Sequence, residues 1–306
     1  MLVTLNEILP QARKKGYAVG AFNTSNLEIT QAILQTAEAL RSPVIVATSE
    51  KAIHYAGIEY IAQIVLSMAK QVRIPVVLHL DHGKSFEIVK ACVLSKYTSV
   101  MIDASHLSFK DNLALTKKVV QYAHRHNVSV EAEIGRLAGI EDDINVRKQE
   151  AIYTDPAQAK QFARESGCDA LAIAIGTSHG AYKFKEKATL KIDILKHIAK
   201  EVNIPLVLHG ASGIKPKWIK YVNTYGGTLD HTKGVPDRLI KQAIHHGISK
   251  INTDTDLRIA FTGGVREYLS KNTDDFDPRA ITGHAREMIK KVVKNRIIVF
   301  GSMHRA

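Results

Sequence analysis

The chain has 306 residues, of which 45% are hydrophobic and 24% charged, a balance typical of ordinary globular proteins rather than disordered or fibrous ones. It contains no apolar run of the roughly 18 residues that a membrane span needs, and its first residues lack the pattern of a secretion signal. The two cysteines do not form a CxxC pair, so we expect reduced core thiols in a cytoplasmic protein.

The 42 basic residues outnumber the 30 acidic residues and give a net charge of +12. Such a charge is compatible with nucleic-acid binding, with anionic substrates or with an ordinary solvated surface. The lysines and arginines lie in short runs without interleaved aromatic residues, which favours the solvated surface. The charge alone does not decide between these classes.

Eight short apolar segments, rich in β-branched residues, recur along the chain. Most are continuous hydrophobic runs, which are typical of strands buried on both faces of a parallel sheet. They cover residues 17–23, 42–49, 74–83, 99–105, 129–135, 170–180, 204–212 and 248–256.

The segments between these strands carry apolar residues at three- and four-residue intervals, as amphipathic helices do. They cover residues 27–40, 59–72, 86–96, 112–126, 156–166 and 237–247. Asp155 before Pro156 is a favourable helix start, and Gly247 is a plausible helix end. Repeated strand–helix units predict an α/β protein with one (β/α)8 TIM-barrel domain over residues 1–306.

Three connections are longer than the others and cover residues 137–153, 182–191 and 223–236. Long charged loops on a barrel usually close over a site. The segment from Phe276 onward predicts one or two amphipathic helices, a C-terminal extension for packing or oligomer contacts.

Nearly every predicted strand ends in a polar or ionisable residue, and the C-terminal ends of the strands are where a barrel of this class places its active site. These residues are Asn23, Ser49, Asp81, His82, Asp103, Glu131, Glu133, Thr177, Ser178, His179, His209, Ser212, Asn252 and Asp254.

Histidines end three of these strands, in "IPVVLHLDHG" (74–83), "GTSHG" (176–180) and "IPLVLHGASG" (204–213). Three protein nitrogens with one open position are the usual build of a catalytic Zn²⁺ site, so His82, His179 and His209 are the predicted ligands. Each of them taken alone could be a hydrogen-bonded wall residue. His79 lies in the interior of its strand, and we expect a core residue or an outer partner of the site.

The acidic residues near these strand ends suggest further roles. Asp81 is next to a predicted ligand, and Gly83 allows the chain to bend so that both side chains reach the site. Asp103 and Glu133 could hold a second cation or orient the imidazoles. Glu141, in the long connection after the fifth strand, could act as a mobile general acid or base.

Two segments rich in glycine or small hydroxyl residues mark the last strands: "GASG" at 210–213 follows strand seven, and "NTDTD" at 252–256 forms the end of strand eight. Loops after strands seven and eight are the common phosphate site of these barrels, because their backbone N–H groups and small hydroxyls meet the anion. We therefore expect a phosphorylated substrate.

The motifs "HLDHG", "SVMIDAS", "VEAEIG", "AIGTSHGAYK", "VLHGASG" and "NTDTDLR", in this order, resemble those of the class II, metal-dependent fructose-bisphosphate aldolases. The resemblance runs over essentially the whole chain, whose length is similar to that of the shorter bacterial subgroup. It implies reversible cleavage of fructose 1,6-bisphosphate to dihydroxyacetone phosphate and glyceraldehyde 3-phosphate, in glycolysis and gluconeogenesis, by a homodimer or homotetramer.

The resemblance also implies roles for individual residues. The three histidines would bind the catalytic Zn²⁺, Asp103 and Glu133 would match a second divalent site, and Asp81 and Glu141 would move protons around a zinc-stabilised enediolate. The substrate and its phosphates, with Na⁺ or K⁺ nearby, would be bound by Asn23, Ser49, Gly180, Gly210, Ser212, Asn252, Asp254, Thr255 and Arg279. Arg279 resembles an arginine that often reaches the substrate across a subunit interface.

Three alternatives remain open at this point. Tagatose-bisphosphate aldolases typically lack the first Asp of "NTDTD", so Asp254 favours fructose. A class I aldolase would need a Schiff-base lysine at a strand end, commonly the sixth, where this chain has none before Lys183. A basic nucleic-acid-binding protein on the same scaffold gives no reason for histidines and carboxylates at the strand ends, so we expect neither nucleic acid nor membrane as the main partner.

Overall fold

The computed structural model describes residues 1–141, 144–146, 151–179, 189–229 and 233–306, and for residues 138–141, 144–146 and 179 the backbone only. Within this part of the chain, eight parallel strands close into a barrel in the order β1-β11-β10-β8-β5-β4-β3-β2. The barrel strands are β1 (Val19–Asn23), β2 (Val44–Ser49), β3 (Val76–Gly83), β4 (Ser99–Ile102), β5 (Ser129–Ile134), β8 (Ala170–Ile173), β10 (Leu206–Leu208) and β11 (Ile248–Thr253). The predicted (β/α)8 barrel and its eight strands are confirmed.

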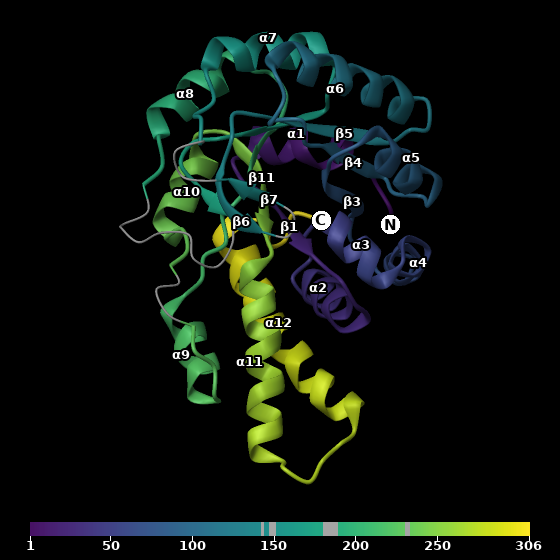
Figure 1. Ribbon diagram of the computed structural model, residues 1–306, viewed down its shortest axis with the longest axis vertical. Helices are drawn as coiled ribbons and strands as arrows, with labels where there is room; N and C mark the ends of the chain where they lie inside the picture. Colours follow the sequence, from purple (N-terminus) through teal and green to yellow (C-terminus); the bar gives the residue numbers. More distant parts are fainter. Residues whose placement is uncertain (142–143, 147–150, 180–188, 230–232) are drawn as a thin grey trace.

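Helices surround this barrel on the outside (Figure 1). Those that the apolar spacing predicted are α2 (Leu27–Ala39), α4 (Ile58–Ala69), α5 (Phe86–Leu94), α6 (Phe109–His124), α7 (Pro156–Ser166) and α10 (Asp237–His245). Those that it missed are α1 (Leu5–Lys15), α3 (Glu50–Ala56), α8 (Ile192–Glu201), α9 (Pro216–Thr224) and α11 (Thr255–Lys271). The predicted C-terminal extension is the long helix α12 (Pro278–Phe300), which packs against α11 and α2.

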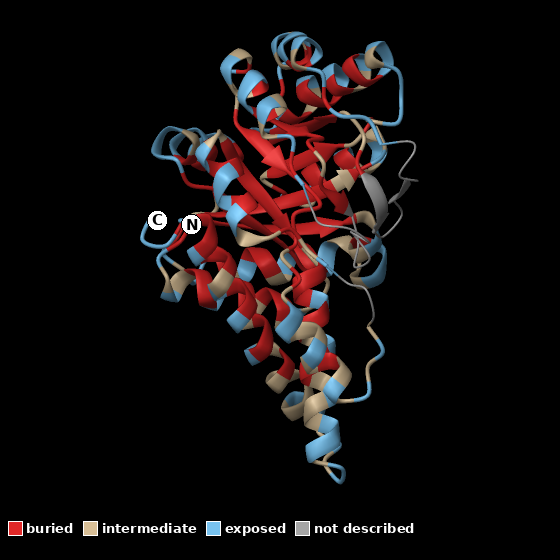
Figure 2. Cartoon of the chain, turned by 90° about the vertical axis from the view of Figure 1, so that its left-hand side faces the viewer, coloured by how far each residue is buried: buried red, intermediate tan, exposed pale blue. Residues whose placement is uncertain are grey.

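Helix α1 closes one end of the barrel. Its Leu5 and Leu9 are fully buried in one cluster with Val77 and Val207, which point inward from the strands. The Leu5 backbone N–H donates to the Ser129 hydroxyl at 3.0 Å and anchors the helix at the start of β5. The interior of the barrel is buried throughout (Figure 2), so the opposite end, at the carboxyl termini of the strands, is left for a site.

The connection at 137–153, predicted as a loop, contains β6 (Ala138–Glu141) and β7 (Ile144–Val146), which pair as an antiparallel hairpin. Strand β6 also pairs in parallel with β9 (Ser178–His179), in the register Gly139 to His179. A small sheet therefore brings the connection after the fifth barrel strand beside the segment that follows the sixth. Of the connection at 182–191, only residues 189–191 are described.

Helices α11 and α12 extend away from the barrel as an antiparallel pair (Figure 1). No helix in the described part of the chain combines the length and the apolar character that crossing a bilayer requires. The cytoplasmic location stays a prediction.

Candidate metal centre and active site

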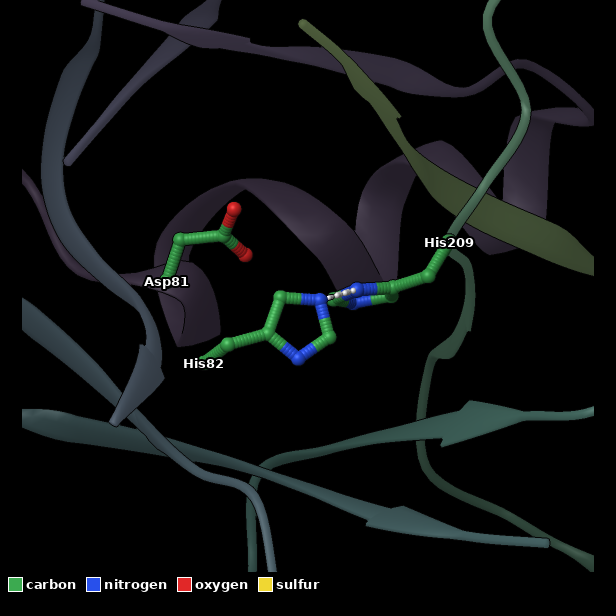
Figure 3. Close-up of side chains that lie close together, drawn as sticks. All are labelled: Asp81, His82 and His209. Atoms are coloured by element: carbon green, nitrogen blue, oxygen red, sulfur yellow. Dashed lines mark hydrogen bonds between the residues drawn. The ribbon is translucent and has the colours of Figure 1, made fainter. Parts of the chain in front are cut away.

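The end of β3 presents two consecutive side chains to the same site. The backbone of His82 lies in the left-handed region, with φ of 50°, and the pairing of β3 with β4 is irregular between Leu80 and Gly83. A Cβ atom at Gly83 would lie 2.7 Å from the Met101 carbonyl oxygen, so only glycine fits there. In a regular strand, consecutive side chains point to opposite faces of the sheet. This irregularity interrupts that alternation and lets the side chains of Asp81 and His82 both face the site (Figure 3).

The imidazoles of His82 and His209 face each other in this site (Figure 3). Nε2 of His82 lies 2.7 Å from Nδ1 of His209. On its far side, His82 Nδ1 donates to Asp103 Oδ2 at 2.7 Å, and His209 Nε2 donates to Glu131 Oε1 at 2.7 Å. Because each neutral imidazole carries one hydrogen, these carboxylates leave a lone pair on each of the two facing nitrogens.

Two lone pairs directed at one point repel each other unless a cation or a proton lies between them. Burial alone would lower the pKa of His82, but the charges of Asp81 and Asp103 outweigh burial, and the pKa rises to about 10. The site therefore strongly favours a positive charge. Imidazole nitrogens whose other nitrogen donates to a carboxylate are the ligands of catalytic zinc sites, so His82 and His209 fit a divalent cation.

Asp81 lies beside this pair and is buried, with 5% of the residue exposed. Its Oδ2 accepts a hydrogen bond from Asn23 Nδ2 at 2.9 Å, and its Oδ1 accepts one from Asn252 Nδ2 at 2.8 Å. Burial raises the pKa of Asp81, but the charges of His82 and His209 outweigh burial and lower it. The nearby histidine charges thus favour the ionised carboxylate, and amides from the ends of β1 and β11 hold both of its oxygens.

Asp103 and Glu133 form a second acidic group with His82. Glu133 Oε2 lies 3.8 Å from His82 Nδ1, is buried, and has no hydrogen-bond partner among the described residues. Burial and the charge of Asp103 raise the pKa of Glu133 well above its usual value. An unpartnered buried carboxylate oxygen beside a second carboxylate is compatible with a further cation.

A buried polar network lies behind His209. The Lys250 ammonium lies 2.8 Å from Glu131 Oε2 and 3.4 Å from His79 Nε2, and His79 Nδ1 lies 2.8 Å from the Ser99 hydroxyl. Glu131 was predicted only as a polar residue at a strand end, with no role of its own, and Lys250 was not predicted. The available signal was a lysine in the interior of the strand "ISKINT", where a buried charge requires a partner.

The loop after β10 is tied to the start of α11. The backbone N–H groups of Gly213 and Ile214 donate to the two carboxylate oxygens of Asp256, each at 2.7 Å. The Asp254 N–H donates to the Ser212 hydroxyl at 3.4 Å. The GASG loop and the N-terminus of α11, where free N–H groups favour anions, are therefore adjacent. The role of Asp256 in holding this loop was not predicted, because its partners Gly213 and Ile214 lie more than 40 residues away in the sequence.

The structure places the other predicted residues as follows. Asn23, Ser49 and Asn252 are buried at the ends of β1, β2 and β11. Ser212 is buried in the loop after β10, and Thr255 is buried at the start of α11. Asp254, at the same end, forms an ion pair with Arg258 at 2.7 Å. Gly210 follows His209 in the left-handed conformation, with φ of 60°.

Four predicted residues are not brought into this chain's site or are not described. The side chain of Arg279 is 89% exposed and pairs with Asp277 at 2.8 Å. It lies beyond the 17 residues of α11, about 25 Å of helix from the end of β11. For Glu141 and His179 only the backbone is described, in β6 and β9, and Gly180 lies outside the described residues.

The fold and the site together define a class of protein, a (β/α)8 barrel with converging imidazoles and buried carboxylates at the carboxyl ends of its strands. The family model for class-II fructose-bisphosphate aldolase matches residues 3–305. A fructose-bisphosphate aldolase of Thermus caldophilus is 51% identical over 306 residues, and one of Helicobacter pylori (strain ATCC 700392 / 26695) is 48% identical, each over the full length of both chains. Among solved structures, the YdjI aldolase of Escherichia coli K12 has a TM-score of 0.82 and 32% identity, with all of both chains covered.

The chain therefore belongs to the class-II fructose-bisphosphate aldolase family and is an aldolase, a carbon–carbon lyase.

Proposed function

We propose that the chain is a Zn²⁺-dependent aldolase that reversibly cleaves fructose 1,6-bisphosphate to dihydroxyacetone phosphate and glyceraldehyde 3-phosphate, in glycolysis and gluconeogenesis. The observation that carries this proposal is the 2.7 Å approach of His82 Nε2 to His209 Nδ1 beside the buried carboxylate of Asp81. Family membership supports the aldolase chemistry, and the converging nitrogens beside Asp81 support a cation site.

His82, His209 and His179 would hold the Zn²⁺. The first two fit because each donates from its other nitrogen to a buried or half-buried carboxylate. His179 is proposed from its motif and its backbone position in β9. The bound cation would polarise the ketone carbonyl and stabilise the negative charge that develops as the carbon–carbon bond breaks.

Asp81 acts as the general base for cleavage. It accepts the proton of the C4 hydroxyl, the C4–O electrons form the aldehyde of glyceraldehyde 3-phosphate, and the C3–C4 bond breaks. The electron pair of that bond stays on the dihydroxyacetone half as an enediolate. The amides of Asn23 and Asn252 hold both Asp81 oxygens and aim the carboxylate at the hydroxyl.

Glu141 then gives a proton to C3 to complete dihydroxyacetone phosphate, and condensation runs these steps in reverse. Asp103 and Glu133 hold a second divalent cation or orient His82, with which both are in contact. The Glu133 oxygen that has no hydrogen-bond partner among the described residues supports the first of these roles.

The substrate is held at the carboxyl ends of the barrel strands. Its phosphates and hydroxyls, with a monovalent cation nearby, are bound by Asn23, Ser49, Gly180, Gly210, Ser212, Asn252, Asp254 and Thr255. The buried tie between the GASG loop and Asp256 supports an anion site between that loop and α11.

Arg279 contributes from a second copy of the chain. Its exposure at the far end of α11 and α12 supports a role in another subunit's site rather than in its own. We therefore propose a homodimer or homotetramer of one-domain subunits in the cytoplasm.

A coupled assay with fructose 1,6-bisphosphate and tagatose 1,6-bisphosphate, with and without Zn²⁺ and EDTA, tests this proposal. We expect faster turnover of the fructose ester, its loss in EDTA and its recovery with Zn²⁺. Preference for the tagatose ester would show that fructose 1,6-bisphosphate is not the main substrate. Full activity in EDTA would show that the reaction does not depend on a metal. Borohydride trapping of the substrate on the chain would indicate a Schiff base instead.

A further inference from the structure

A buried ion pair lies directly behind the metal centre. Lys250 and Glu131 are both fully buried inside the barrel, with the ammonium 3.0 Å from Oε1 and 2.8 Å from Oε2 of the carboxylate. Removing two charges from water costs several kcal/mol per ion, and well-packed apolar side chains often do as well or better in such places. Stability alone therefore gives no reason for this pair.

The pair leads through hydrogen bonds to His209. Glu131 Oε1 accepts from the His209 Nε2–H at 2.7 Å and from the Lys250 ammonium at 3.0 Å. An ammonium can only donate, so it holds Glu131 as a pure acceptor. Glu131 in turn requires that the hydrogen of His209 lies on Nε2. The lone pair of His209 is then on Nδ1, the nitrogen that faces His82.

His79 holds the ammonium from the other side. Its Nε2 lies 3.4 Å from Lys250 Nζ and must accept, so its hydrogen lies on Nδ1 and is donated to the Ser99 hydroxyl at 2.8 Å. The ammonium therefore sets the positions of the hydrogens on both His79 and His209 in this buried network.

We propose that Lys250 is a positioning residue that acts through Glu131 to fix the ring orientation and the tautomer of His209, so that Nδ1 is presented to a divalent cation. His79 keeps the ammonium in place. This inference rests on the metal site of the proposed function. It also gives a physical reason for a lysine inside a buried strand that does not act as a Schiff base, since its ammonium is directed at a carboxylate.

The test is the affinity of the purified, metal-free full chain for Zn²⁺, measured by competition with a chromophoric chelator. We expect Lys250→Met to weaken Zn²⁺ binding about 10- to 100-fold, the usual effect of disturbing the outer partner of a metal-bound histidine, here Glu131, which Lys250 holds in place. Lys241→Met, which removes an exposed lysine from α10, is the matched control and should bind as the wild type does.

Lys250→Met also leaves Glu131 as an unpaired buried charge, so it should lower stability. The double variant Lys250→Met/Glu131→Gln separates the two effects. It removes the unpaired charge and should regain stability, but the glutamine amide can turn either its oxygen or its nitrogen toward His209. Weak Zn²⁺ binding should therefore persist, and the visible absorption of bound Co²⁺ should differ from that of the wild type.

Recovery of Zn²⁺ affinity together with stability in the double variant would overturn the positioning role, as would wild-type affinity in Lys250→Met. If the wild-type chain itself bound no Zn²⁺, the proposed metal site would be wrong, and the positioning role of Lys250 would have no basis.

Discussion

His82 and His209, separated by 127 residues in the chain, meet edge to face with ring centroids 4.5 Å apart and planes at 84°. One comes from the strained end of β3 and the other directly follows β10. Asp103 and Glu131 each hold the outer nitrogen of one ring. The lone pairs of the two inner nitrogens thereby converge on one point, where the proposed function places the cation.

Asp81→Ala should keep its Zn²⁺ and lose turnover by about 10²- to 10⁴-fold, because a general base is removed while the imidazoles remain. Metal content and fructose 1,6-bisphosphate cleavage, measured on the same sample, check this. Asp193→Ala, whose side chain is 96% exposed on α8, is the control and should match the wild type. Loss of Zn²⁺ from Asp81→Ala would make Asp81 a ligand instead of a base.

Asp256→Asn should raise KM for the bisphosphate with a much smaller effect on kcat. The asparagine can present only one oxygen, so one of the N–H groups of Gly213 and Ile214 loses its acceptor and the loop loosens. Steady-state kinetics over a range of substrate concentrations separates the two constants. An unchanged KM would show that the hydrogen bonds from Gly213 and Ile214 to Asp256 do not shape the anion site.

Gly213→Ala should destabilise the chain by about 1–3 kcal/mol, the usual cost of overpacking. A Cβ there would lie 2.4 Å from Nη1 of Arg296, which is only 2% exposed and therefore has little room to move away. The same change at Gly283, inside α12, meets nothing within 4 Å and should stabilise by about 0.5–1 kcal/mol. Urea unfolding of the two variants should give shifts of opposite sign.

Glu267 should make stability depend on pH in acid. Burial raises its pKa, but hydrogen bonds from Lys271, Tyr221 and His284 outweigh burial and lower the pKa from 4.5 to about 2. The ionised form is therefore favoured by folding, so its contribution is complete above pH 4.5 and is lost as the pH falls toward 2. The melting temperature of the wild type should exceed that of Glu267→Gln at pH 7, and the gap should close over this interval. A gap that stays constant down to pH 2.5 would contradict this assignment.

The barrel strands could be predicted because burial on both faces leaves a continuous apolar run that is visible in the sequence. The helices that were missed have weaker signals. Helix α1 contains Pro10, and α11 contains the pair Gly263 and Gly264, each unfavourable inside a helix. The β6–β7 pair was interpreted as a loop because its two strands are only four and three residues long and lie in a connection, 137–153, that is rich in charged residues.

The positions of the site residues follow from the rule that a barrel carries its site at the carboxyl ends of its strands, which is why Asp81, His82 and His209 could be proposed together. The Lys250–Glu131 pair could not be predicted in this way. The two residues are 119 positions apart, and each lies inside its own strand, so only the closed barrel brings them together. The placement of Arg279 likewise depends on the length and direction of α11, which no local pattern specifies.

Zinc binding between His82 and His209 is tested most directly by a crystal structure of the purified chain with an anomalous difference map recorded at the zinc absorption edge. We predict a strong peak about 2.0–2.1 Å from both His82 Nε2 and His209 Nδ1. A map with no peak between these two nitrogens, or with zinc bound only elsewhere, would contradict zinc binding by His82 and His209.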